Sequence, residues 1–256
     1  MFGSLPSSGY LPVTVEIKNN TGADRVWSLD FVSTDEDGYA YFGSGNKVNT
    51  MESSFQFACG NGEDKVYSVL VPVMTDFPSR RGGYNSALNL QLTTRSSGLE
   101  MELDSMRSTS MDQWPSVLMS KSLHVKNGAQ LDTHLESKFS GRGYSGNVEF
   151  AGDFDPAILP TDWRAYEGYS SVILTQKEWD DLAPAPRSAM LEWVRLGGQL
   201  IVCTSSGSAD LNALGLGKFA DGERTAARSH GSVTVFPTTA ELELEKNELT
   251  LVIENL

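Results

Sequence analysis

The sequence predicts two domains, an all-β sandwich followed by an α/β domain built on a parallel sheet. Residues 1–107 contain short alternating runs separated by turn clusters, with no segment of helical periodicity between them. From residue 112 onward, continuous apolar runs alternate with helical segments, which is the pattern of βαβ units. The chain has 256 residues, enough for two domains of ordinary size.

The first domain is predicted from strand periodicity. Alternation is clearest in PVTVEIKN, residues 12–19, where Val13, Val15 and Ile17 share one face of the strand. Further strands are expected at residues 25–33, 53–59, 65–73, 87–94 and 99–103. Strands of this length and spacing favour an antiparallel sandwich of immunoglobulin-like type. The Cys…Trp…Cys pattern of antibody domains is missing, so only the architecture is implied.

The boundary between the domains is expected in DSMRSTSMDQW, residues 104–114. This segment is polar and lacks apolar periodicity, so it is predicted to be a linker. The expected domains are therefore residues 1–107 and 112–256.

The second domain is predicted from its continuous apolar runs. Strands are expected at residues 115–120, 147–152, 170–175, 199–204 and 232–237. Continuous apolar strands are typical of a parallel sheet that is buried on both faces. The strands at 115–120, 170–175 and 199–204 are therefore predicted to lie parallel in one sheet.

The helices of this domain are predicted from spacing and from helix stops. Residues 129–140 have Leu131, Leu135 and Phe139 four apart. Residues 176–198 are helical but interrupted by prolines, which predicts a short helix and then a longer one that ends at a Gly-Gly pair. Residues 238–256 combine features of helix and strand and are assigned to neither.

Composition and charge exclude several classes of partner. The net charge is −13 and the pI about 4.6, which argues against nucleic acid and against docking on an anionic membrane surface. No run of 18 apolar residues could span a bilayer, and the first residues lack the basic and apolar regions of a signal peptide.

No metal or cofactor is expected. His124, His134 and His230 lie far apart, with no Cys-x-x-Cys pattern nearby, and no Walker lysine is present. Asp155 is expected to cap a turn before Pro156 rather than to bind a cation.

The two cysteines, Cys59 and Cys203, are in different halves of the chain and are expected to be free buried thiols rather than a bridge. Their number does not indicate a compartment.

One block of the second half resembles a known family. It comprises DPAILP at 155–160, the aromatic positions after it, SSVILT at 170–175, a Trp-Asp-Asp-Leu helix, LEWVRLGGQLIV at 191–202 and a small polar loop. The block, about residues 112 to 236, resembles the glutamine amidotransferase-like domains of bacterial envelope proteins. The resemblance implies a flavodoxin-like α/β fold, a β-sandwich before it, a periplasmic or surface location, and a membrane anchor outside this chain.

Active members of class I glutamine amidotransferases carry a cysteine in a Gly-x-Cys-x-Gly elbow and a His-x-Glu pair near the C-terminus. Here Cys203 stands in IVCTS without flanking glycines, and His230 is followed by Ser232 where the motif has Glu. The catalytic set therefore does not carry over, and Cys203 is predicted to be a core residue.

We therefore expect a non-enzymatic binding or assembly module, with an unknown protein partner or small ligand. In open α/β sheets ligands bind at the carboxyl ends of the strands. The candidate ligand-binding residues at this edge are Ser120, Thr175, Thr204, Ser205 and Ser206. The alternative is a cysteine-dependent amidotransferase or hydrolase that uses Cys203 and His230.

Overall fold

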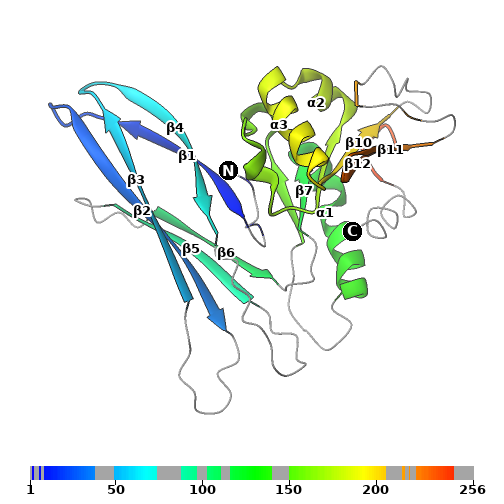
Figure 1. The fold of residues 1–256 in the computed structure, drawn as a ribbon, viewed down its shortest axis with the longest axis horizontal. Coiled ribbons are helices and arrows are strands. Elements are labelled where there is room, and N and C mark those ends of the chain that lie inside the picture. Colours follow the sequence, from blue (N-terminus) through cyan, green and yellow to red (C-terminus); the bar gives the residue numbers. More distant parts are fainter. Residues whose placement is uncertain are drawn as a thin grey trace, which may run out of the picture. The chain divides into compact units, whose positions relative to one another are not determined.

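The chain divides into two compact units in a computed structural model (Figure 1). One unit comprises Met1 and Leu5–Asp112, and the other comprises Phe2–Ser4 and Gln113–Leu256. The structure describes residues 2, 6, 9–37, 49–73, 88–96, 103–110, 116–139, 150–205, 215–216, 219 and 223–244. Over these residues the first unit contains strands without helices, and the second contains a mostly parallel sheet with helices. The predicted combination of an all-β half and an α/β half is confirmed at this level.

Two antiparallel sheets make up the first unit. The smaller pairs β1 (Tyr10–Lys18) with β4 (Asp64–Pro72). The larger has the order β3-β2-β5-β6, formed by β3 (Asn49–Cys59), β2 (Arg25–Asp37), β5 (Leu88–Ser96) and β6 (Leu103–Ser110).

The core of the first unit is shared by the two sheets. Leu11 and Val71 of the smaller sheet are fully buried, and Phe31 and Phe57 of the larger sheet are 3% and 2% exposed in the same cluster. Successive side chains of a strand point to opposite faces, so the alternation seen in the sequence places one apolar face of each sheet in this core.

The expected linker at 104–114 is wrong over its first part. Residues 103–110 form β6, which pairs antiparallel with β5 so that Ser110 lies opposite Leu88. Ladder hydrogen bonds are made by the main chain, so a strand does not need an apolar side-chain pattern to pair. The strand predicted at 99–103 lies outside the described residues except for its last position.

The second unit contains six strands and three α-helices among its described residues. In chain order they are β7 (Val117–Ser120), α1 (Lys121–Phe139), β8 (Ala151–Phe154), β9 (Ser171–Thr175), α2 (Gln176–Asp181), α3 (Pro184–Arg195), β10 (Gln199–Thr204), β11 (Thr225–Arg228) and β12 (Gly231–Pro237). Two short 3₁₀ turns, η1 (Pro156–Ile158) and η2 (Trp163–Tyr166), connect β8 to β9. Along the sheet the strand order is β11-β12-β10-β9-β7-β8.

The parallel pairing predicted for three strands is confirmed. β7 pairs parallel with β9, and β9 pairs parallel with β10. Every residue of these three strands is buried, which is why each reads as a continuous run in the sequence. Among the described strands of this sheet, β11 alone pairs in the antiparallel direction; it forms an edge hairpin with β12 and was not predicted.

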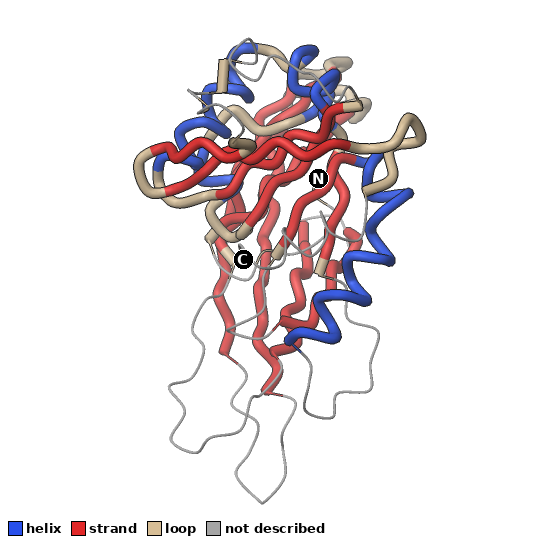
Figure 2. Tube along the Cα trace, turned by 90° about the vertical axis from the view of Figure 1, so that its right-hand side faces the viewer, coloured by secondary structure: helices blue, strands red, loops and turns tan. Residues whose placement is uncertain are grey.

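The strand order predicts that the helices cover both faces of this sheet, because crossovers between parallel strands are right-handed as a rule. The chain moves from β7 to β8 in one direction and from β9 to β10 in the other, so α1 and the pair α2 and α3 cover opposite faces. Figure 2 shows the long α1 helix separated from the shorter helices by strands. None of the helices in the described part of the chain is long and apolar enough to cross a membrane.

The helix between β9 and β10 breaks as predicted, into α2 and α3, and α3 stops at the glycine pair. Gly197 has a φ of +127°, its N–H bonds to the carbonyl of Val194, and the N–H of Gly198 bonds to the carbonyl of Trp193. This is the Schellman arrangement, in which glycine avoids the cost of a positive φ. The first predicted helix, 129–140, begins eight residues earlier than expected, at Lys121.

Candidate functional site

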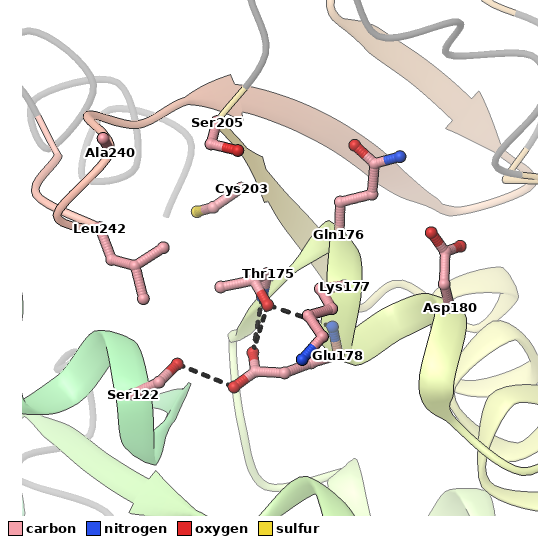
Figure 3. Close-up of a pocket in the computed structure, with 10 residues that line it drawn as sticks. All are labelled: Ser122, Thr175, Gln176, Lys177, Glu178, Asp180, Cys203, Ser205, Ala240 and Leu242. Atoms are coloured by element: carbon pink, nitrogen blue, oxygen red, sulfur yellow. Dashed lines mark hydrogen bonds between the residues drawn. The ribbon is translucent and has the colours of Figure 1, made fainter.

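A pocket of about 560 Å³ opens at the carboxyl ends of β9 and β10 in the second unit (Figure 3). Its volume is in the range of small-molecule sites. The residues that line it are Ser122, Thr175, Gln176, Lys177, Glu178, Asp180, Cys203, Ser205, Ala240 and Leu242.

The strand order explains why a pocket forms at this edge. From β7 the chain runs through α1 to β8 on one side, whereas β9, β10 and β12 follow on the other side. The connections that leave the ends of β7 and β9 therefore diverge and leave a crevice between them. Ser122 lies just after β7, Thr175 ends β9, and Ser205 follows β10.

Glu178 organises the floor of the pocket. Its Oε2 accepts hydrogen bonds from the Thr175 backbone N–H at 2.8 Å and from Thr175 Oγ1 at 2.9 Å. Thr175 Oγ1 in turn accepts from the Glu178 N–H at 3.1 Å, which completes a capping box at the start of α2.

The other carboxylate oxygen of Glu178 joins α2 to α1. Ser122 Oγ donates to Glu178 Oε1 at 2.8 Å, as Figure 3 shows. Since the one hydroxyl proton of Ser122 is used in this bond, the 3.4 Å contact with Ser120 requires Ser120 Oγ to be the donor. The network makes Glu178 a structural bridge, because three of its acceptor positions are already used within the protein.

The remaining lining residues leave polar groups on one side and an apolar wall on the other. Lys177 and Asp180 are exposed on α2, Gln176 is partly exposed at its first position, and Ser205 is also exposed. Cys203, Ala240 and Leu242 supply apolar or weakly polar surface. Such a pocket suits a small molecule with an apolar part and a few hydrogen-bonding groups.

The structure brings some of the predicted site residues together and not others. Thr175 and Ser205 line the pocket. Ser120 is fully buried and Thr204 is 3% exposed, and neither is part of the wall. Ser206 lies outside the described residues.

The alternative pair Cys203 and His230 is not brought together. Cys203 lies opposite Phe236 near the carboxyl end of β12, whereas His230 lies in the turn before β12, and its N–H bonds to the Arg195 carbonyl. Gln199, which lies opposite Ser232 where β12 begins to pair with β10, is four residue steps along the strand from Cys203, a distance of about 13 Å. A histidine at that end of the sheet cannot take a proton from this thiol.

Cys203 is 1% exposed and Cys59 is 2% exposed, and neither forms a disulfide. Asp155 caps η1 as predicted, accepting from the Ala157 N–H at 2.9 Å. Over the described residues there is no group of three or more His, Cys, Asp or Glu side chains that could hold a metal ion.

Several lining residues were missed by sequence reasoning. Ser122, Gln176 and Glu178 lie within three residues after strands whose carboxyl ends were predicted to form the site, so their position was an available signal. Ala240 and Leu242 come from the segment after β12, which had no assigned structure, and nothing in the sequence indicated their place.

No family model matches this chain, and no curated protein matches it. Similar solved structures include a beta-glucuronidase from Bacteroides uniformis, with 11% identity and a TM-score of 0.30 over 84% of this chain and 34% of that chain. A calcium-binding mutant of beta-glucuronidase 2 from Bacteroides uniformis has 10% identity and a TM-score of 0.25, over 84% of this chain and 24% of that chain. The sporulation control protein Spo0M from Bacillus subtilis has 13% identity and a TM-score of 0.24, over 43% of this chain and 46% of that chain. The chain thus spans less than half the length of each of these structures, and likenesses at this level carry no functional argument.

Proposed function

We propose that the chain is a non-enzymatic binding module of a bacterial cell-envelope protein, in which an immunoglobulin-like sandwich accompanies a catalytically degenerate glutamine amidotransferase-like domain. The module binds a small ligand at the carboxyl edge of its parallel sheet. Its location is periplasmic or on the cell surface, and it reaches the membrane only through segments outside this chain.

Support for the fold of the second domain comes from the order of its parallel strands. Numbered along the chain, β8, β7, β9, β10 and β12 have the order 2-1-3-4-5, which is the flavodoxin-like order. Its switch point lies between β7 and β9, where the pocket has two of its walls. This order also agrees with the family that the sequence block at 155–202 resembles.

The observation that carries the proposed function is the composition of the pocket. The pocket lies at the carboxyl ends of the strands and is lined by hydrogen-bonding groups. Cys203 is in its wall, but His230, in the turn between β11 and β12, lies at the other end of the sheet. Glu178 is held by hydrogen bonds from Ser122 and Thr175, an arrangement that preorganises a binding surface.

A ligand screen by thermal unfolding tests the proposal. The thermal unfolding of the parent chain is measured with each member of a panel of amino acids, glutamine included, and small sugars. The same measurements are made on the variant Ser205→Trp, in which the larger side chain fills the pocket. A ligand present at a concentration of 100 times its Kd adds about 2.7 kcal/mol to the stability of the folded state, and it raises the midpoint of thermal unfolding by about 5 °C or more. The shift is expected in the parent chain and lost in Ser205→Trp.

The control is Val125→Trp, which changes an exposed position of α1 that does not line the pocket. This variant should keep the shift. Release of ammonia from glutamine by the parent chain, abolished by Cys203→Ala, would instead establish the amidotransferase alternative. A panel that shifts none of the proteins would argue against a small-ligand site.

A further inference from the structure

Leu242, in the segment after β12, has a backbone conformation that is unusual for leucine. Its φ is +65°, and among the described residues only Ser229 is a second non-glycine residue with a positive φ. In this region the Cβ of an L-residue crowds its own main chain, so glycine and asparagine are the residues usually found there. Leucine in this conformation therefore carries strain that glycine would avoid.

A tight turn imposes this conformation. The Leu242 N–H donates to the Thr239 carbonyl at 3.0 Å, the Thr239 N–H donates to the Glu243 carbonyl at 3.1 Å, and the Glu243 N–H donates to Thr239 Oγ1 at 3.1 Å. Three-residue turns of this kind commonly end in a residue with a left-handed backbone, and glycine is preferred there. The sequence TTAELEL, residues 238–244, instead has leucine at that position.

Bonds on both sides of Leu242 hold the strained backbone in place. The Leu242 carbonyl accepts from Asn127 Nδ2 at 2.9 Å, and the Leu244 N–H donates to Asn127 Oδ1 at 2.9 Å. Asn127 and Leu244 are buried, at 1% and 4% exposed. Strained backbone persists where the surrounding structure determines it this strongly, and it is concentrated at ligand-binding sites.

The Leu242 side chain serves the pocket rather than the core. It is only half-buried, whereas Leu244, two residues later, is buried. It lines the pocket at the ends of β9 and β10 together with Ala240 and Cys203. Neither the turn nor the core requires leucine at this position, so its contact with the pocket accounts for a residue that the turn disfavours.

The other side of the pocket has unused polar groups. Gln176, Lys177 and Asp180 line it, and none of their side chains forms a hydrogen bond or ion pair with another described residue. Figure 3 shows Gln176 and Asp180 across the pocket from Leu242 and Ala240. A bound molecule therefore meets an aliphatic wall at one end and groups of both charges at the other.

We propose that Leu242 is a specificity-determining residue of this pocket, and that the ligand is a free amino acid with an aliphatic side chain. The side chain of the ligand packs on Leu242 and Ala240. Its ammonium group meets the Asp180 carboxylate, and its carboxylate meets the Lys177 ammonium group. This inference rests on the proposed function, because it names the ligand of the same pocket. The side chains of Leu242 and Ala240 offer no hydrogen bond to an amide, so leucine should bind more tightly than glutamine.

Isothermal titration calorimetry of the full chain with L-leucine, L-alanine and L-glutamine tests the ligand class. The three amino acids share the same charged groups, so differences in Kd report on the side chain. In the parent chain leucine should bind at least about tenfold more tightly than alanine, as expected for added methylenes in an apolar pocket. In Leu242→Gly this preference should fall by about fivefold or more, because part of the apolar wall is lost. The Kd for alanine should be unchanged.

The thermal midpoint without ligand separates a binding role from a structural one. Leu242→Gly loses a half-buried side chain but also relieves the positive φ, so its midpoint should not fall below that of the parent chain. A leucine required for folding would instead lower the midpoint and weaken the binding of all three amino acids together. Leu242→Asn, which also tolerates a positive φ, should show the same loss of preference for leucine.

Ser229→Gly is the matched control. It relieves a φ of +55° in the exposed turn between β11 and β12, at a position that does not line the pocket. This variant should therefore keep the preference of the parent chain for leucine.

An unchanged preference for leucine in both Leu242→Gly and Leu242→Asn would overturn the proposal, as would a parent chain that does not bind leucine. If such a parent chain still bound another member of the panel of amino acids and sugars, and Ser205→Trp lost that binding, the proposed function would stand and only this inference would fail. A parent chain that binds no member of the panel would contradict both.

Discussion

At the scale of single residues, Cys203 is the position on which an enzymatic interpretation depends. Its side chain is 1% exposed although it contributes to the wall of the pocket, so a reagent reaches the thiol only when the site opens. The nearest strand neighbour toward β12 is Phe236, not a proton acceptor. Both observations favour a packing role, since small free cysteines are common in buried strands.

Iodoacetamide at pH 7 should therefore label Cys203 slowly in the native chain and quickly after denaturation. Mass spectrometry of the intact protein measures the extent of labelling. The matched control is Ser205→Cys, which places a thiol at an exposed position of the same pocket and should react at the rate of a free thiol. Rapid native labelling of Cys203 that is abolished by His230→Ala would contradict this assignment.

Gly231 makes a second residue-scale prediction. A Cβ at this position would lie 2.1 Å from the Val194 carbonyl oxygen and 2.2 Å from that of Gly198, both backbone atoms that cannot rotate away. Gly231→Ala must therefore displace β12 from the end of α3, and it should destabilise the second unit by about 2–3 kcal/mol. Urea unfolding followed by circular dichroism measures the loss. The exposed substitution Glu223→Ala should change stability by less than about 0.5 kcal/mol.

At the scale of elements, a buried asparagine fastens the segment after β12 to α1. Asn127 is 1% exposed, donates to the carbonyls of Leu123 and Leu242 at 2.9 Å each, and accepts from the Leu244 N–H at 2.9 Å. These bonds place Leu242 at the pocket wall. Asn127 therefore connects the helix to the candidate site.

Asn127→Ala should leave the Leu244 N–H without its acceptor and cost about 2–3 kcal/mol, because buried polar groups lose their partners. Amide hydrogen exchange should show faster exchange at Leu244, together with weaker ligand binding at the pocket. The neighbouring exposed substitution Lys126→Ala should change neither. Unaltered exchange at Leu244 in Asn127→Ala would show that the segment is held by other contacts.

The elements that could be predicted from the sequence are those whose pattern reflects burial. β9 and β10 are buried along their whole length, so both read as continuous apolar runs. β11 was missed because its four residues, TAAR, alternate exposed and buried positions with only Ala226 fully inside. The first two turns of α1 were missed because Asn127 and Gly128 lower helix propensity, and the tertiary bonds of Asn127 offset this.

The sequence predicted the sheet edge at which the candidate site lies, but not most of the residues that line it. The rule that ligands bind at the carboxyl ends of parallel strands correctly indicated Thr175 and Ser205. It could not separate a wall residue from a buried one such as Ser120, because that depends on how α1 turns away from the sheet. Leu242 reaches the site through a bond to a residue 115 positions earlier, a contact that local patterns do not encode.

At the scale of the whole molecule, each unit has its own hydrophobic core. Leu11, Phe31 and Phe57 belong to the cluster of the first unit, and strands such as β9 are fully buried within the second. Independent cores predict units that unfold independently. A polar linker at residues 104–114 would predict protease cleavage near Arg107, but the structure does not favour cleavage there, because Arg107 lies in β6 opposite Gln91.

Independence can be tested by damaging one core at a time. Phe57→Ala removes a side chain that is 2% exposed in the first unit, and Trp193→Ala removes one that is 4% exposed in the second; each should cost its own unit about 3–5 kcal/mol. In urea, hydrogen exchange of Val13 reports on the first unit and that of Ile173 on the second. Each substitution should shift only the transition of the unit that contains it, and the double variant should show both shifts unchanged, as expected for separate sites. If Phe57→Ala lowered the free energy of exchange at Ile173 by as much as it lowers that at Val13, the two units would form one cooperative structure.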